Sequence, residues 1–497
     1  MILEALTTVL AALVSSYLIW LVAKRKQKDG EPPIVPFWIP WLGSGLQYQK
    51  DPITFLRKQE KKYGPIFTVF MGGSYFTFVT DPFTHPIIAK ESKVLNFRIC
   101  TIPTIKKVFD FTRRGVDVPT MGGLMVKYMQ GHWLETLVSK MMGNLQKVLL
   151  HGSYNNTEWA TTGLLHLVET VMCTAGFKSL FGEYPASSGV DNNKLHHKIV
   201  EDFVKFDKAF PLLVQGRPIS SLKGVKESRA NMWKFFTMDE IHKREMVYEM
   251  VEQYAKKLEE DQELEQLKKE LYCVNWAAMS NTLLSAFWAL YYILKHPEAM
   301  EAANVEIQRM LKETSQCVDG KSEINFTRDD MAKMTVLDSI INETLRLDIS
   351  SSLLRQALQD YNLKVVSADR SYKIRKGDKL MTLFQLTHYD PEIYEQPDQF
   401  KFDRFLNSDG SPKTDFYKKG KVVKFFLQPF GSGVSKCPGR YWAVTELKQL
   451  VILLLLYFDF KLINPEQEIK MDQIRVAFGS LPPNIDPQVQ FKRRVIV

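Results

Sequence analysis

The sequence predicts a mainly α-helical fold with small β-sheets. The runs from Tyr272 to Lys295 and from Tyr441 to Tyr457 are long and largely apolar, which is typical of buried helices. Between Ile66 and Val79, two short apolar and aromatic runs flank Gly72-Gly73 and predict a β-hairpin. Most of the remaining chain is expected to be helical. Longer loops are expected near residues 97–125 and 182–194.

Length, charge and cysteine usage narrow the class of protein. A chain of 497 residues can bury a large core, and its size alone would suggest two or three domains. Lys and Arg outnumber Asp and Glu by 65 to 56, so the net charge is +9, which suits an anionic membrane or an acidic protein partner. We expect no nucleic-acid partner, because there is no zinc-finger spacing and no long basic run. The five cysteines are scattered without Cys-x-x-Cys pairs, which predicts reduced thiols on the cytosolic side.

Residues 1–23 are predicted to form a transmembrane signal anchor. They are mostly apolar and long enough to cross a bilayer. Four basic residues follow directly, namely Lys24, Arg25, Lys26 and Lys28. No cleavage site with small residues is visible. The alternative is a cleaved signal peptide, which would place the body of the protein in an oxidising lumen. The scattered cysteines do not favour that location.

Residues 24–45 are predicted to be a basic, proline-rich hinge. Proline fixes φ, so Gly30-Glu31-Pro32-Pro33 and the prolines after it indicate a stiff connection that aims the body at the membrane surface. Trp38 and Trp41 suit either the membrane interface or an ordinary core.

Two stretches in the middle of the chain have distinct polar patterns. Residues 196–236 hold two amphipathic segments, around Pro211 and Pro218. Residues 256–270 are dense in alternating charge, which predicts a solvated helix face.

The helix predicted from Tyr272 to Lys295 contains an unusual polar segment. Small residues at Ala277 and Ala278 would let this helix pass close over a flat cofactor. Ser280, Asn281 and Thr282 can bond back to helix carbonyls and loosen the helix. The alternative is a buried polar patch in a core helix.

Glu343 and Arg346 lie at i and i+3 on one helix face, where side chains meet. In an arbitrary protein this would be a surface ion pair of little energetic value. The segment Phe402-Asp403-Arg404-Phe405 supplies a second arginine further along the chain.

Cys437 lies in a glycine-rich loop that opens onto the last long helix. The glycines at 431, 433 and 439 permit turns closed to other residues and a close approach of a flat ligand. Amide groups at the helix N-terminus favour a thiolate, which is the axial ligand that haem iron needs for splitting dioxygen. The alternative is a small buried apolar residue.

Together these motifs resemble those of the cytochromes P-450. Phe430, Gly433, Cys437 and Gly439 match the signature Phe-x-x-Gly-x-x-x-Cys-x-Gly, and Glu343-x-x-Arg346 precedes them in the family's order. The resemblance implies a cytochrome P-450 fold in which residues 46–497 form one haem-thiolate catalytic domain. It implies that Cys437 binds the iron of haem b (iron protoporphyrin IX), and that Glu343, Arg346 and Arg404 form a structural network.

The chain departs from the family pattern at two places. Ser435 stands where many members carry a basic residue, with Lys436 beside it, so a propionate contact from that position is in doubt. Ser280 replaces the family's acid and Asn281 its threonine, so the ordinary proton relay is in doubt as well. The resemblance assigns haem contacts to Phe430, Gly433, Gly439, Arg355 and Lys436.

The pattern Trp-Ala-x-x-x-Asn-Thr, ending at Thr282 and followed by Phe-Trp-Ala, resembles one branch of the family. That branch holds the sterol 7α-hydroxylases, the sterol 12α-hydroxylase and prostacyclin synthase. It implies a monooxygenase of cholesterol and bile acid metabolism that hydroxylates a sterol or oxysterol, of the 7α-hydroxylase type. The alternatives are a sterol 12α-hydroxylase, an endoperoxide isomerase like prostacyclin synthase, and a haem-binding sensor without enzymatic activity.

The resemblance also implies site residues and partners. Asn281, Ser280 and Thr282 would act in oxygen chemistry. The substrate pocket would be lined by Ile99, Ile105, Ala278, Ser350, Leu353 and Phe478. Electrons would come from NADPH through cytochrome P-450 reductase, docked near Lys436, Arg440 and Lys448. The protein would lie in the endoplasmic reticulum membrane with its catalytic domain in the cytosol.

Overall fold

The computed structural model describes residues 10, 14–18, 20–21, 24–112, 121–152, 154–319 and 323–495. Most of the predicted anchor, residues 1–23, therefore lies outside the described residues. The helices are α2 Gly45–Lys50, α3 Pro52–Tyr63, α4 His85–Lys90, α5 Arg98–Phe109, α6 Met121–Tyr128, α7 Gly131–His151, α8 Leu164–Phe181, α9 Asn192–Gln215, α10 Val225–Lys234, α11 Met238–His242, α12 Glu249–Glu260, α13 Leu264–Lys295, α14 Pro297–Glu313, α15 Arg328–Ala332, α16 Thr335–Asp348, α17 Gln385–His388 and α18 Arg440–Tyr457.

The strands are short and belong to several small sheets. They are β1 Ile66–Met71, β2 Ser74–Val79, β3 Leu95–Asn96, β4 Ala160–Gly163, β5 Ile349–Ser350, β6 Ser352–Ala357, β7 Tyr361–Val365, β8 Arg370–Ile374, β9 Lys379–Leu383, β10 Tyr417–Lys418, β11 Lys421–Val422, β12 Phe458–Leu462, β13 Gly479–Ser480 and β14 Gln488–Arg493. Short 3₁₀ turns are η1 Ala186–Ser188, η2 Ile219–Ser221, η3 Gly433–Ser435 and η4 Gln473–Arg475. The predicted mainly helical fold with small sheets is confirmed.

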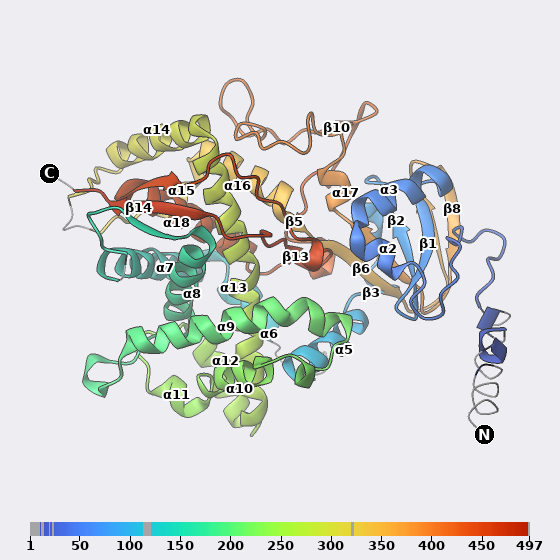
Figure 1. Ribbon diagram of the computed structural model, residues 1–497, viewed down its shortest axis with the longest axis horizontal. Helices are drawn as coiled ribbons and strands as arrows, with labels where there is room; N and C mark the ends of the chain where they lie inside the picture. Colours follow the sequence, from blue (N-terminus) through green and yellow to red (C-terminus); the bar gives the residue numbers. More distant parts are fainter. Residues whose placement is uncertain are drawn as a thin grey trace.

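The molecule has a large helical part and a smaller β-rich part beside the N-terminus (Figure 1). The β-rich part is built on a five-stranded sheet of order β1-β2-β9-β6-β3. The predicted hairpin is confirmed, with Ile66 opposite Val79. Gly72 and Gly73 have φ values of 56° and 74°, which is the left-handed conformation that a two-residue hairpin turn requires.

The long helix α13 runs through the centre of the helical part and packs against α8, α16 and α18 (Figure 1). Within the described ranges, Leu164–Phe181 and Leu264–Lys295 are long and apolar enough to cross a membrane. Most of each helix is buried inside the protein, so both are core helices. Burial on most sides explains why the apolar 18-residue stretch of each helix lacks a polar face.

The proline-rich segment after residue 24 is bonded to the five-stranded sheet. Val35 N–H donates to Thr68 O at 2.8 Å, and Thr68 N–H donates to Pro33 O at 2.8 Å. Glu31 pairs with Arg375 in the turn before β9. Trp38 and Trp41 are 74% and 66% exposed, so the alternative that they are core residues is wrong.

Two predictions along the chain need correction. The loop expected over residues 97–125 holds α5 and α6, because the inner face of α5 is buried and this packing outweighs the helix-breaking effect of Pro103. The central helix begins at Leu264 rather than Tyr272, and the charged stretch 256–270 is divided between α12 and α13.

Candidate active site

The cysteine loop is held in one conformation by its backbone. Gly433 has a φ of 61°, and a Cβ at this position would lie 2.2 Å from the carbonyl oxygen of Ala89. No other residue therefore fits there without a shift of the chain. Cys437 N–H donates to Phe430 O at 2.9 Å, and Gly439 caps helix α18 directly after the cysteine. The loop thus presents Cys437 at a helix N-terminus, as the sequence predicts.

The surroundings of Cys437 have opposing effects on the pKa of its thiol. Burial raises the pKa of the Cys437 thiol, whereas hydrogen bonds from the backbone of Gly439 and Arg440 and the charge of Arg440 lower it. The net effect is a raised pKa, so the helix N-terminus alone does not produce a thiolate. A bound metal ion deprotonates a coordinating thiol outright. The site therefore suits a cysteine that becomes a thiolate on binding iron.

Arg355 in β6 is a buried cation beside the cysteine loop. It is fully buried, and its Nη2 donates to Ser435 Oγ at 2.8 Å and to Ser432 O at 3.3 Å. Burial lowers the pKa of Arg355 to about 10. Its Nε makes no hydrogen bond, and no acidic residue in the described part of the chain pairs with it.

A buried guanidinium without an anion is costly, so this position fits a group that brings its own negative charge. A haem propionate is such a group, and the residues present therefore fit haem. Ser435 replaces the expected basic residue and accepts a hydrogen bond from Arg355 instead. Lys436 is exposed, and its predicted contact with haem stays a prediction.

The three polar side chains of α13, Ser280, Asn281 and Thr282, have different hydrogen-bond partners. Asn281 Oδ1 accepts the backbone N–H of Ser480 at 3.1 Å, while its Nδ2 makes no hydrogen bond to any described residue. This arrangement presents Asn281 as a hydrogen-bond donor. Thr282 Oγ1 donates to Ala278 O at 3.2 Å, the expected bond back to the helix.

Ser280 is fully buried and faces away from Asn281, in a cluster that ties three elements together. Its hydroxyl donates to Asp207 in α9 and accepts from Arg475 in η4. Asp207 also accepts from Trp276 Nε1 at 2.8 Å and from Arg475 Nη1 at 2.9 Å. Sequence reasoning did not detect this cluster, because Asp207, Ser280 and Arg475 are far apart along the chain.

Glu343, Arg346 and Arg404 meet in a buried network. Glu343 accepts from Arg346 Nε at 2.7 Å and from Arg404 Nε at 2.8 Å. Arg346 Nη1 donates to the carbonyl oxygens of His388 and Pro397 at 2.7 and 2.6 Å. These contacts join helix α16 to the chain before the cysteine loop.

The elements that carry the predicted pocket residues contact one another. Helix α5 contacts α13 and β6, and α13 contacts β13. Ser350 Oγ accepts the N–H of Ala477, and the Phe478 ring lies 6.2 Å from that of Phe210 in α9. The remaining predicted members differ in burial: Ile99 is exposed, Ala278 partly buried, and Ile105 and Leu353 buried. Their contacts with a substrate stay predictions.

The surface around the cysteine loop differs from the expectation at one lysine. Lys436 is exposed and Arg440 partly exposed. Lys448 is buried, and its Nζ pairs with Asp338 at 2.6 Å and donates to Met331 O at 2.7 Å. The prediction that Lys448 contacts a reductase is therefore wrong, because α18 is buried on that side.

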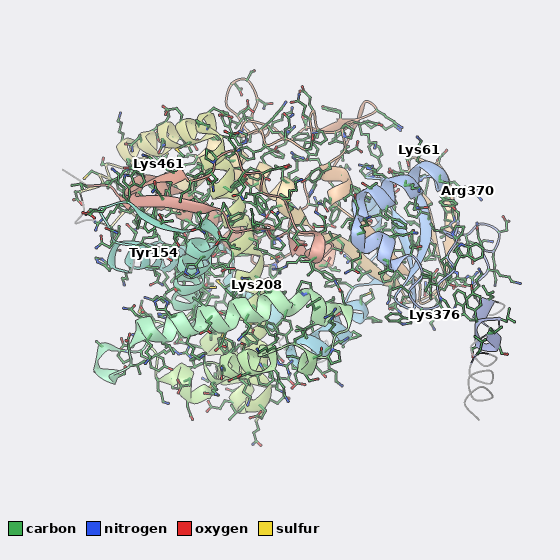
Figure 2. All side chains as sticks on the ribbon, viewed as in Figure 1. Lys61, Tyr154, Lys208, Arg370, Lys376 and Lys461 are labelled. Atoms are coloured by element: carbon green, nitrogen blue, oxygen red, sulfur yellow. The ribbon has the colours of Figure 1, made fainter. Side chains whose placement is uncertain are left out.

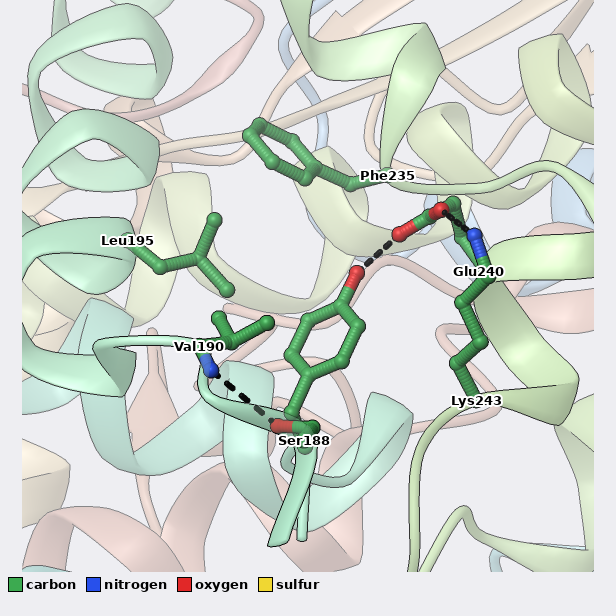
Figure 3. A pocket seen from close by; sticks show the side chains of 7 residues that line it. Ser188, Val190, Leu195, Phe235, Glu240 and Lys243 are labelled. Carbon is green, nitrogen blue, oxygen red and sulfur yellow. Dashed lines mark hydrogen bonds and ion pairs between the residues drawn. The ribbon is translucent and has the colours of Figure 1, made fainter. Parts of the chain in front are cut away.

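A separate cavity of about 400 Å³ contains none of the predicted site residues. Its walls come from the chain between α8 and α9, from the start of α9, and from the chain between α10 and α12 (Figure 3). The hydroxyl of Tyr184 donates to Glu240 there, and Lys243 pairs with the same carboxylate. The polar groups of its wall thus satisfy one another.

Comparisons with a family model and with individual proteins agree on the family that this chain matches. The model of the family described as cytochrome P450 matches residues 32–489. The chain is 36% identical over 489 residues to cytochrome P450 7A1 of Sus scrofa, which covers 95% of this chain and 96% of that protein. It is 32% identical over 498 residues to cholesterol 7-alpha-monooxygenase of Cricetulus griseus, with 97% of each covered. It is 34% identical over 482 residues to 7-alpha-hydroxycholest-4-en-3-one 12-alpha-hydroxylase of Oryctolagus cuniculus, with 94% of each covered.

Proposed function

Because this chain belongs to the cytochrome P450 family and is a monooxygenase, we propose that it hydroxylates a sterol or an oxysterol. The observation that carries the substrate class is the similarity, over nearly the whole chain, to relatives whose names specify sterol hydroxylation. The proposed reaction is of the 7α-hydroxylase type and uses O₂ and electrons from NADPH. Hydroxylation at position 12α is the second candidate, since a 12-alpha-hydroxylase is about as similar to the chain.

The residues at the site have distinct roles in this proposal. Cys437 and Arg355 would hold haem b, by its iron and by a propionate. Haem, when bound, supplies the activation of dioxygen. Asn281 donates a hydrogen bond from Nδ2 into the site, because its Oδ1 is fixed by Ser480. The apolar residues of α5, α13 and β6 would exclude water and hold the rigid sterol skeleton.

A panel of sterols tests the substrate class. Purified holoprotein should give substrate-induced changes of its haem spectrum with cholesterol or an oxysterol, and product analysis should locate the new hydroxyl group. Hydroxylation at carbon 12 would favour the second candidate. Spectral changes with an endoperoxide analogue but with none of the sterols would argue against a sterol hydroxylase.

Asn281→Ala is expected to uncouple NADPH consumption from sterol hydroxylation. The variant loses the amide donor, so we expect more peroxide and less product for each NADPH, with sterol binding largely unchanged. The measurement compares product, peroxide and NADPH for wild type and variant. Reactions without NADPH are the control: rearrangement of an endoperoxide without NADPH, together with no sterol oxidation, would contradict the hydroxylase proposal.

We also propose that NADPH–cytochrome P450 reductase docks on the exposed surface around Lys436 and Arg440. Complementary charge mainly raises the association rate and is screened by salt. Lys436→Glu with Arg440→Glu should therefore slow reduction of the holoprotein at low ionic strength, and added salt should diminish the difference from wild type. Lys61→Glu with Arg370→Glu is the matched control, because it makes the same charge change on the β-rich part (Figure 2). An equal effect of both pairs would place docking elsewhere.

We propose that residues 1–23 anchor the protein in the endoplasmic reticulum membrane, with the catalytic domain in the cytosol. The four basic residues that follow favour this orientation. Trp38 and Trp41 are exposed close to this end of the chain and are suited to the interface. Protease digestion of intact microsomes should degrade the catalytic domain, whereas a protected domain would place it in the lumen.

A further inference from the structure

Asp348 is a buried carboxyl group at the junction of four elements. It is the last residue of α16 and is followed directly by β5, beside α13 and β13. Its side chain is fully buried. Its Oδ2 accepts from Ser285 Oγ at 2.7 Å and from the hydroxyl of Ser480, whereas its Oδ1 has no hydrogen-bond partner in the described part of the chain.

Among the residues that the structure describes, no cation pairs with this carboxyl group. The ionisable groups that act on it from neighbouring elements are the phenols of Tyr292 in α13 and Tyr389 after α17, and burial raises the pKa of both. Arg346 and Glu343 are in the same helix but are paired in the network with Arg404. A buried, unpaired carboxylate is costly, so the neutral acid is favoured. Burial accordingly raises the pKa of Asp348 to about 7.

The two hydroxyl partners of Asp348, Ser285 and Ser480, both lie next to Asn281. Ser285 follows Asn281 by one helical turn on the same face of α13, where side chains are neighbours. Ser480 donates its backbone N–H to Asn281 Oδ1 and its hydroxyl to Asp348. The hydroxyls of Ser285 and Ser480 lie 3.4 Å apart.

The two hydroxyls next to Asn281 in sequence are engaged elsewhere. Ser280 is bonded to Asp207 and Arg475, and Thr282 is bonded to the carbonyl oxygen of Ala278. Thr282 also interacts with the buried carboxyl group of Glu446 in α18. Asp348 differs from Asp207 and Glu446 because one residue, Ser480, bonds to both Asp348 and Asn281.

We propose that Asp348 holds a proton for the oxygen chemistry beside Asn281 and delivers it through Ser285, a role that rests on the proposed monooxygenase function. One O₂, two electrons and two protons yield one hydroxyl group on the substrate and one water. The Ser285 hydroxyl, which donates to Asp348 in this structure, turns away and passes its proton through water to the oxygen atom that leaves as water. Asp348 then gives its own proton to Ser285 Oγ. Asp348 is left as a carboxylate and takes up a proton from solvent. Asp348 acts through another group and is thus a positioning residue.

Asp348→Asn tests this role, because it keeps the shape of the side chain and removes the titratable proton. Product per NADPH in the wild type should fall as pH rises through about 7, where Asp348 ionises. In the variant it should be lower by about 10²-fold, with no such pH dependence, and with sterol binding retained. Glu306→Gln is the matched control, since Glu306 is also a buried acid whose pKa burial raises, but it accepts the N–H groups of Val336 and Leu337.

Two further readouts do not depend on the identity of the substrate. Infrared spectra of the oxidised holoprotein should show a protonated carboxyl band that titrates near pH 7 and is missing in Asp348→Asn. The pKa of Asp348 is raised on folding, so its contribution to stability is full at acid pH and is lost as pH rises through about 7. The melting temperature of the wild type should therefore fall relative to that of Asp348→Asn over this range.

The outcomes separate the two proposals. If the wild type hydroxylates no sterol, the proposed substrate class is wrong. The role of Asp348 is then tested by measuring how much of the oxygen that is reduced with NADPH becomes water and how much becomes peroxide. A variant that makes water as efficiently as wild type at every pH would overturn the role of Asp348. So would the absence of an Asp348-dependent carboxyl band.

Discussion

Arg346→Ala is expected to yield little folded, haem-loaded protein. Arg346 is fully buried and donates to Glu343 as well as to the carbonyl oxygens of His388, Pro397 and Gln399. Its removal takes this donor from the carbonyl oxygens of His388 and Pro397 and leaves Glu343 to Arg404 and the N–H of Lys401. Breaking one member of a buried charged network costs about 3–5 kcal/mol. That is a large share of the roughly 5–15 kcal/mol by which native proteins are stable. Denaturant unfolding and the haem content of the purified variant measure the effect.

Arg309→Ala is the control for the loss of an arginine from a helix. Arg309 in α14 is 50% exposed and lies within 4 Å of Glu306 and Glu313 on its own helix. The exposed pair with Glu313 contributes at most about 1 kcal/mol. The buried Glu306 keeps the N–H groups of Val336 and Leu337 when Arg309 is removed. Arg346→Ala holoprotein that is as stable as wild type, and defective only in turnover, would show that the network acts in catalysis rather than in folding.

Features that depend on residues close together in the sequence could be predicted. The cysteine loop depends on glycines within a few residues of Cys437, and Glu343 and Arg346 are neighbours on one helix. The length and apolar character of α18 were also visible, because burial on all sides leaves a continuous apolar pattern. The burial of Lys448 was missed because a lysine in such a helix looks exposed by its type alone.

Contacts between distant segments could not be predicted. Ser280 and Asn281 stood out as departures from the family pattern, but their partners Arg475 and Ser480 lie about two hundred residues further along the chain. Asp348 and Ser480 are separated by 132 residues. Such pairs follow from the packing of α13 against α16 and β13, which sequence periodicity does not define. Helix α5 was missed for a similar reason, since its burial overrides its internal proline.

The last prediction concerns Cys437, the proposed haem ligand. Cys437→Ala is expected to abolish the thiolate-type Soret band of the reduced carbonyl complex, because thiolate ligation is its cause. Cys437→His keeps a possible axial ligand and should give holoprotein with the spectrum of an imidazole-bound haem. Cys100→Ala is the sharpest control, because Cys100 in α5 is a cysteine whose charge acts on the buried Arg355. Cys100→Ala should keep the thiolate band, whereas its loss in Cys100→Ala and retention in Cys437→Ala would move the ligand to α5.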